Sequence, residues 1–197
     1  MKYGVQNLSQ TLLGGAPDLV VSGPNVGGNI GVQLPFSGTV GAASAAADQL
    51  SVPGIAFSGS TGSQTGFDAA TPDYSLLYAD LATNVTSTIL ASGAPYLPNG
   101  TWVNVNFPAA GSGTACTSTS DFKFVLARLF TATIISGTDV TTCGNDGRLP
   151  AESAVIGTDG CYASIAVGKA SNKLDADEAD QAMVLSKLTK ILSCLPS

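Results

Sequence analysis

The chain has 197 residues, enough to bury one sizeable core, and no shift in composition marks a second domain, so we expect a single domain over residues 1–197. Only 11% of the residues are charged, the formal net charge is −6 and no basic cluster occurs, which argues against nucleic acid or an anionic membrane as a partner. The absence of histidine excludes Ser-His-Asp and Cys-His nucleophiles, HExxH zinc sites and imidazole acid–base chemistry. Any catalysis must use carboxylates, hydroxyls, amides or a metal held by oxygen.

The stretch from Pro17 to Ser58 has the pattern of a βαβ unit, which predicts a parallel sheet. Before it, residues 1–16 resemble the tail of a helix that runs into a Gly14-Gly15 turn. The unit consists of a strand, a glycine-rich loop, a helix and a second strand, at Asp18–Ser22, Gly23–Gly31, from about Ser37, and at Ile55–Ser58.

The predicted helix opens with Ser37, Gly38 and Thr39, and the hydroxyl of Ser37 is suited to cap its first N–H groups. Helix N-termini attract anions, so this end is a candidate anion site. Alanine and glycine then fill most of positions 41–47, which allows close packing of the helix on the sheet. Small residues at a helix start favour anion binding and close packing alike, so the pattern alone does not decide between these two interpretations.

Further elements follow in chain order. After a polar loop at 59–73, apolar spacing predicts a covering helix at Tyr74–Leu90, and the alternation WVNVNF predicts a strand at Trp102–Phe107. We expect Asn104 and Asn106 to share one face of that strand, either as ligand contacts or, as we favour, as solvent-facing or sheet-edge amides. Later predictions are a strand within Leu129–Ser136, strand on both sides of Gly160-Cys161 within Ala154–Val167, and a final amphipathic helix that begins with acidic residues and extends to Leu195.

The four cysteines all lie in the second half of the chain and form no CxxC pair. An even count in a charge-poor chain favours two disulfides and an oxidising compartment, with four free buried thiols as the alternative. Among three possible pairings we favour Cys116 with Cys143 and Cys161 with Cys194. Sequons at Asn7, Asn84 and Asn99 add weak support for a secreted glycoprotein, although the first ten residues lack the apolar segment of a signal peptide.

Several segments together resemble the SurE-like survival-protein family of phosphatases and nucleotidases. They are DLVVSGPNVGGNIG at 18–31, FSGTVGAA at 36–43 and GIAFS at 54–58, followed by WVNVNFP at 102–108 and GCYASIAV at 160–167, which look like the fungal, secreted form. The resemblance implies a three-layer αβα fold with a mostly parallel, Rossmann-like sheet. It also implies metal-dependent hydrolysis of phosphate monoesters, with a nucleotide or another small phosphate ester as substrate, in a protein that is usually a homo-oligomer.

The resemblance also implies roles for individual residues. The position of Asn25 is that of a metal ligand, and Asn29, Ser37, Gly38 and Thr39 match residues that line the phosphate pocket. An oxygen ligand at a strand end beside a helix N-terminus is where an open α/β sheet places a phosphate. Mg²⁺ or Mn²⁺ suits such oxygen ligands.

One departure from the family pattern concerns the metal. The family begins with a strand that ends in a paired Asp-Asp, the principal metal ligands, and this sequence has no adjacent Asp-Asp. We therefore expect the first strands of the domain to lie upstream of Met1. Two hypotheses follow: a secreted phosphatase or nucleotidase that is active with its upstream half, or a non-catalytic secreted protein that keeps the phosphate-binding loop as structure.

Overall fold

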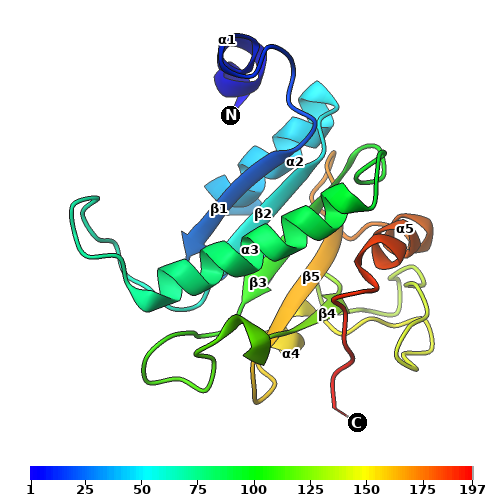
Figure 1. Cartoon of the computed structure of the whole chain (residues 1–197). Coiled ribbons are helices and arrows are strands. Elements are labelled where there is room, and N and C mark those ends of the chain that lie inside the picture. Colours follow the sequence, from blue (N-terminus) through cyan, green and yellow to red (C-terminus); the bar gives the residue numbers. More distant parts are fainter. Residues whose placement is uncertain (197) are drawn as a thin grey trace.

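A five-stranded sheet forms the centre of the computed structural model, which describes residues 1–196 (Figure 1). The strand order is β1-β2-β3-β5-β4. All neighbouring pairs are parallel except β3 with β5, which is antiparallel. The strands are β1 (Val20–Val26), β2 (Gly54–Gly59), β3 (Thr101–Phe107), β4 (Lys123–Ala127) and β5 (Tyr162–Lys169).

Helices cover both faces of the sheet, and this confirms the three-layer α/β fold with a mostly parallel sheet. In Figure 1 α3 and α5 lie in front of the sheet and α2 and α4 behind it. None of the helices within residues 1–196 is long and apolar enough to cross a membrane. The α-helices are α1 (Ser9–Leu12), α2 (Gly38–Leu50), α3 (Asp73–Ala91), α4 (Glu152–Ile156) and α5 (Glu178–Leu188), with a π-helical segment η1 (Gly4–Leu8) and the 3₁₀ segments η2 (Gly31–Phe36) and η3 (Thr119–Asp121).

The alternation of side chains along the strands creates two different cores. Odd-numbered residues of β2 and β3, such as Phe57 and Val105, pack against α3 and α5. Even-numbered residues, such as Ala56 and Trp102, pack against α2. At Gly54 a Cβ atom would lie 2.4 Å from the carbonyl oxygen of Ala43, so the alanine-rich helix does pack closely on the sheet.

Two predicted strands differ from the structure. The fourth strand is Lys123–Ala127, whereas most of Leu129–Ser136 is irregular, because the buried guanidinium of Arg128 bonds to Phe130 O, Asp139 and Asp175 and turns the chain out of the sheet. Within Ala154–Val167, the residues before Gly157 form the end of α4, and only β5 is strand.

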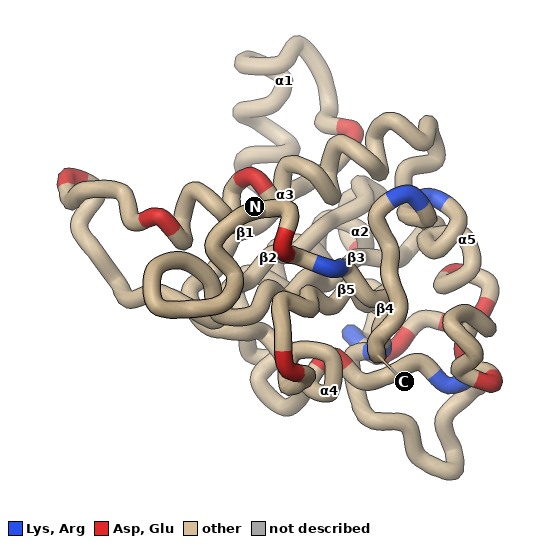
Figure 2. The backbone as a smooth tube through the Cα atoms, turned by 60° about the horizontal axis from the view of Figure 1, so that its bottom comes forward, with Lys and Arg blue, Asp and Glu red and all other residues tan. Residues whose placement is uncertain are grey.

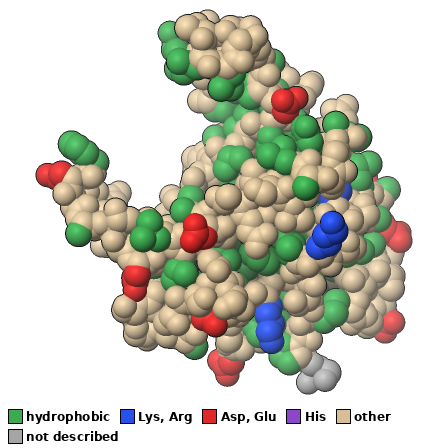
Figure 3. Space-filling view, viewed as in Figure 1, with side chains coloured by type: hydrophobic (Ala, Val, Ile, Leu, Met, Phe, Trp, Pro, Cys, Tyr) green, Lys and Arg blue, Asp and Glu red, His purple; other side chains and the backbone are tan. Residues whose placement is uncertain are grey.

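Both ends of the chain also bear on the predictions. The final helix begins as expected, with the Asp177 carboxylate capping the N–H of Asp180, but it ends at Leu188. Residues 189–196 form a tail beside β4, where the N–H of Ser193 bonds to Phe124 O. At the other end, η1 and α1 confirm the expected helical segment, which stands away from the body of the molecule (Figures 1 and 3).

The predicted disulfide pairing is wrong. The bonds join Cys116 with Cys161 and Cys143 with Cys194. Because β5 runs antiparallel to β3, the carboxyl end of β3 and the amino end of β5 lie side by side. This brings Cys116, which follows β3, close to Cys161, which precedes β5. The second bond ties the segment before α4 to the tail that runs beside β4.

The second disulfide yields a stability prediction. Replacing Cys143 and Cys194 together by serine should lower the free energy of unfolding by about 2–4 kcal/mol, because the bond closes a long loop with a sequence separation of 51 residues. Chemical denaturation of both proteins under oxidising conditions measures the difference. Equal midpoints and slopes would show that this bond does not stabilise the fold.

Candidate functional site

A row of polar side chains crosses the sheet near the carboxyl ends of β1, β2 and β3. Asn25 pairs in register with Ser58, Ser58 with Asn106, and Asn106 with Ser164 on β5. Ser58, Asn106 and Ser164 are fully or almost fully buried. Burying polar side chains inside an apolar sheet costs free energy unless they are hydrogen-bonded. The hydrogen-bond partners of this row therefore show which part of the chain it holds in place.

The row holds the loop that follows β1, and Asn29 is the point of attachment. The N–H of Asn29 donates to Asn106 Oδ1 over 2.9 Å, and its side-chain amide donates to Ser58 Oγ. Its carbonyl oxygen accepts from Asn104 Nδ2 at 2.9 Å and from Asn106 Nδ2 at 3.3 Å. Asn29 is only 6% exposed, so the donors of this residue point into the protein and fix the loop on the sheet.

Asn104 and Asn106 therefore take neither of the roles considered from the sequence. They lie on the central strand β3 with 0% and 1% exposure, so the favoured interpretation as solvent-facing or sheet-edge amides is wrong. The reason is that β3 has a strand partner on each side, β2 and β5, and that α2 and α4 cover the face on which both amides lie. The NH₂ groups of both side chains and the oxygen of Asn106 take part in internal hydrogen bonds, whereas Asn104 Oδ1 is buried without a partner.

A buried carboxyl group completes the cluster. Glu152, on α4, is wholly buried and accepts from Asn104 Nδ2, at 3.1 and 2.9 Å to its two oxygens, and from Asn106 Nδ2 at 3.1 Å. The Ser164 hydroxyl lies 3.3 Å from Oε1. Burial raises the pKa of Glu152 to about 8, against the lowering effect of these hydrogen bonds. Sequence reasoning missed Glu152 because it lies just before the predicted strand region Ala154–Val167 and no helix was predicted there, and the only available signal was an acidic residue at a possible helix start.

The helix start matches the prediction in its local geometry. Ser37 is the N-cap of α2, and its Oγ accepts from the N–H of Val40 at 3.2 Å. Gly38 is exposed, Ser37 and Thr39 are partly exposed, and open space surrounds the position where a Cβ of Gly38 would be. The first N–H groups of the helix thus remain accessible to an anion.

Asn25 was expected to be a metal ligand. It is half-buried, and its Nδ2 donates to the carbonyl oxygens of Val26 and Gly27 at 2.9 and 3.0 Å. This orientation leaves Oδ1 available. Within residues 1–196, however, no three Asp, Glu, His or Cys side chains form a group that could hold a metal ion. A hard divalent ion needs carboxylate ligands, so the residues present do not by themselves fit one.

Positive potential around these elements comes mainly from backbone N–H groups. No lysine or arginine occurs between residues 3 and 122, which includes β1, α2, β2 and β3. Figure 2 shows the few basic residues at separate places rather than in a patch. One of them, Lys173, donates from Nζ to Pro35 O at 3.1 Å, two residues before the Ser37 cap. Binding of an anion at this end of α2 would therefore depend mainly on the backbone N–H groups of the first helical turn.

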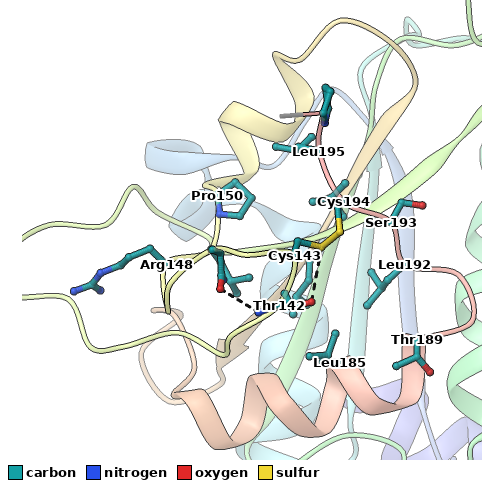
Figure 4. A pocket seen from close by; sticks show the side chains of 15 residues that line it. Thr142, Cys143, Arg148, Pro150, Leu185, Thr189, Leu192, Ser193, Cys194 and Leu195 are labelled. Carbon is teal, nitrogen blue, oxygen red and sulfur yellow. Dashed lines mark hydrogen bonds between the residues drawn. A yellow bond between two sulfur atoms is a disulfide. The ribbon is translucent and has the colours of Figure 1, made fainter.

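A cavity of about 510 Å³ lies elsewhere, between α5, the C-terminal tail and the segment before α4 (Figure 4). Its lining is mostly apolar and includes Leu149, Leu185, Leu192 and the Cys143–Cys194 disulfide. Figure 4 shows the guanidinium of Arg148 pointing away from the disulfide. The cavity shares no residue with the cluster around Asn29, so it is not part of the candidate phosphate site.

The pKa of Glu152 yields a pH prediction. Between its unfolded value of 4.5 and its folded value of about 8, the folded protein binds one proton more than the unfolded chain. This group therefore stabilises the fold fully at low pH, and its contribution falls by up to ~1.4 kcal/mol per pH unit as the pH rises towards 8. Unfolding free energies at several pH values should show this slope in the wild type and lose it in Glu152→Gln. Parallel pH profiles would contradict the assignment.

Comparison with known proteins identifies the family. The family model "Survival protein SurE" matches residues 1–133. The chain is 45% identical over 97 residues to "5'-nucleotidase SurE" of Desulfatibacillum aliphaticivorans, an alignment that covers 49% of this chain and 34% of that protein. It is 34% identical over 178 residues to "Acid phosphatase" of Yarrowia lipolytica, covering 76% of this chain and 49% of the relative.

A solved structure supports the fold independently. The crystal structure of the SurE protein from Aquifex aeolicus superposes with a TM-score of 0.55 at 20% identity, over 86% of this chain and 64% of that one. The chain thus spans between a third and a half of the length of the two curated relatives above. From the family match over two thirds of its length, together with these likenesses, the chain belongs to the SurE survival-protein family.

Proposed function

We propose that this protein hydrolyses phosphate monoesters, with nucleoside monophosphates as the substrate class, and that the described residues form its phosphate-binding part. The observation that carries the proposal is the accessible, Ser37-capped N-terminus of α2, which follows a loop fixed to the sheet at Asn29. Relatives named nucleotidase and acid phosphatase support the reaction class. Both names describe removal of a phosphoryl group from an ester.

In this proposal the residues around the helix start have distinct roles. The N–H groups of Gly38 and Thr39 and the hydroxyl of Ser37 bind the phosphoryl oxygens, since unpaired N–H groups and the helix dipole both favour negative charge. Asn29 lines the phosphate site as an anchor, because its backbone N–H is bonded to Asn106 and its side-chain NH₂ to Ser58. The absence of basic side chains between residues 3 and 122 makes the backbone the main source of positive potential.

The proposal also includes a divalent cation, Mg²⁺ or Mn²⁺, with Asn25 Oδ1 as one ligand. When bound beside a phosphate, such an ion polarises the phosphoryl oxygens and activates water. Carboxylate ligands are required in addition, and within residues 1–196 none joins Asn25 in a metal-binding group. We therefore assign the described residues phosphate binding and one amide ligand, and no step of the hydrolysis.

The missing carboxylates favour a second candidate function, a non-catalytic secreted protein that retains the loop as structure. The two candidates differ in one measurable property, because a structural loop needs no affinity for phosphate. Secretion is itself a proposal, supported by two disulfides and by exposed asparagines in all three sequons, at Asn7, Asn84 and Asn99. Assembly as a homo-oligomer likewise remains a proposal.

The first test concerns the helix start. Ser37→Ala should weaken binding of inorganic phosphate by about fivefold or more, because one hydroxyl contact and the cap are both lost. Isothermal titration measures the affinity. Ser44→Ala, within the same helix, is the matched control and should leave it unchanged, since its Oγ only faces Gly41 O at 3.5 Å. Equal phosphate affinity of wild type and Ser37→Ala would remove the helix start from the site.

The second test concerns the cation and uses the protein as its gene encodes it, with a nucleoside monophosphate as substrate. Asn25→Ala should raise the Mn²⁺ concentration needed for half-maximal hydrolysis by about tenfold or more, because one oxygen ligand is removed. Asn84→Ala, an exposed asparagine on α3, serves as the control. If metal dependence is the same in Asn25→Ala and the control, Asn25 is not a ligand. If the wild type hydrolyses nothing at any metal concentration, the non-catalytic alternative holds.

A further inference from the structure

Glu152 is the one buried carboxyl group in the cluster, and neither the phosphate pocket nor the proposed cation site uses it. It lies on α4, and its side chain reaches the same two amide groups that hold the carbonyl oxygen of Asn29. Asn104 Nδ2 and Asn106 Nδ2 thus each bridge Glu152 and Asn29. The carboxyl group acts on the loop after β1 through two intervening side chains.

The geometry explains what the carboxyl group contributes. A side-chain amide can be turned so that either its NH₂ or its oxygen faces a given partner. Asn29 needs the NH₂ of Asn104 and Asn106 at its carbonyl oxygen, and the oxygen of Asn106 at its N–H. Glu152 Oε1 accepts from the NH₂ groups of both asparagines. It therefore stabilises this orientation over the reversed one, in which amide oxygens would face Oε1 and Asn29 O, and this outweighs the cost of Asn104 Oδ1, which is buried without a hydrogen-bond partner.

The burial of this group supports a specific role. Glu152 is fully buried, and its hydrogen-bond partners, Asn104, Asn106 and Ser164, are all neutral. Within residues 1–196 no lysine or arginine pairs with it. Burying a carboxyl group without a cation costs free energy, and an apolar side chain at this place would avoid the cost. Burial raises its pKa to about 8, which keeps the group largely uncharged at neutral pH while one oxygen remains an acceptor.

We propose that Glu152 is a positioning residue for the phosphate-binding loop: it selects the amide orientation of Asn104 and Asn106 that fixes Asn29 and with it the residues leading to the start of α2. The predicted effect of Glu152 on phosphate binding rests on the proposed function. Its predicted effect on the order of the loop does not.

Two variants test whether the loop depends on the reach and acceptor oxygen of the Glu152 side chain or only on the presence of a carboxyl group. Glu152→Asp keeps the carboxyl group but withdraws it by about 1.5 Å, so it no longer reaches both amides. Glu152→Gln keeps the length and one acceptor oxygen. If Glu152 positions the loop, Glu152→Asp should disturb the loop after β1, and Glu152→Gln should leave it as in the wild type.

The experiment measures amide hydrogen exchange at Asn29 by NMR and binding of inorganic phosphate by titration. For Glu152→Asp we expect exchange at Asn29 at least about tenfold faster and phosphate affinity at least about fivefold weaker, as the loss of one or two buried hydrogen bonds implies. For Glu152→Gln both values should stay within about twofold of wild type.

Gln181→Asn is the matched control. Gln181 is also buried and bonded, to Val140 N, Asp139 and Ala176 O, and the substitution shortens it by the same length away from the loop. It should lower the melting temperature as Glu152→Asp does but leave Asn29 exchange and phosphate affinity unchanged. If Glu152→Asp fails to fold, Ser164→Ala provides the test, because it removes one partner of the carboxyl group and leaves both asparagines in place.

The outcomes are distinct. Faster exchange at Asn29 in Glu152→Asp, or in Ser164→Ala if the aspartate variant does not fold, and not in Gln181→Asn supports the assignment. Exchange at Asn29 that matches the control overturns it. If wild-type protein does not bind phosphate, the proposed function fails, and exchange at Asn29 alone then decides whether Glu152 positions the loop.

Discussion

The hydrogen bonds between Asn29 and the two asparagines of β3 are the constraint on which the candidate site depends. They join a loop after the edge strand β1 to the middle of the sheet, over a sequence separation of 77 residues in the case of Asn106. A glycine-rich loop has many conformations, and its order has an entropic cost. Fixing it at one buried residue defines the path of the chain that leads through η2 to the start of α2.

The composition of the chain is consistent with this arrangement. A surface with few charges cannot attract phosphate by a basic patch, and the described site offers instead N–H groups at a capped helix start. The Ser37 cap occupies the N–H of Val40 and leaves the N–H groups of Gly38 and Thr39 accessible, while the close contact of Ala43 with Gly54 holds the helix on the sheet. The two interpretations left open by the sequence, anion binding and tight packing, thus concern different turns of one helix. The packing is observed, and the anion binding is proposed.

Local patterns sufficed for part of the fold. The βαβ unit, the Ser37 cap and the strand at β3 depend on neighbouring residues, and each was predictable. The pairing of the cysteines, the position of β4 and the burial of Asn104 depend on strand order, and nothing local to the sequence shows that β5 lies between β3 and β4. For the same reason Glu152 was not recognisable, because the two asparagines that it contacts are more than 40 residues away on β3.

A crystal structure of the protein soaked with an oxyanion that scatters anomalously, such as tungstate, tests the central claim most directly. We expect an anomalous peak within hydrogen-bond distance of the N–H groups of Gly38 and Thr39, with Asn29 still bonded to Asn104 and Asn106. A peak at another place on the protein, or none at the start of α2 at a concentration that saturates phosphate binding in solution, would contradict it.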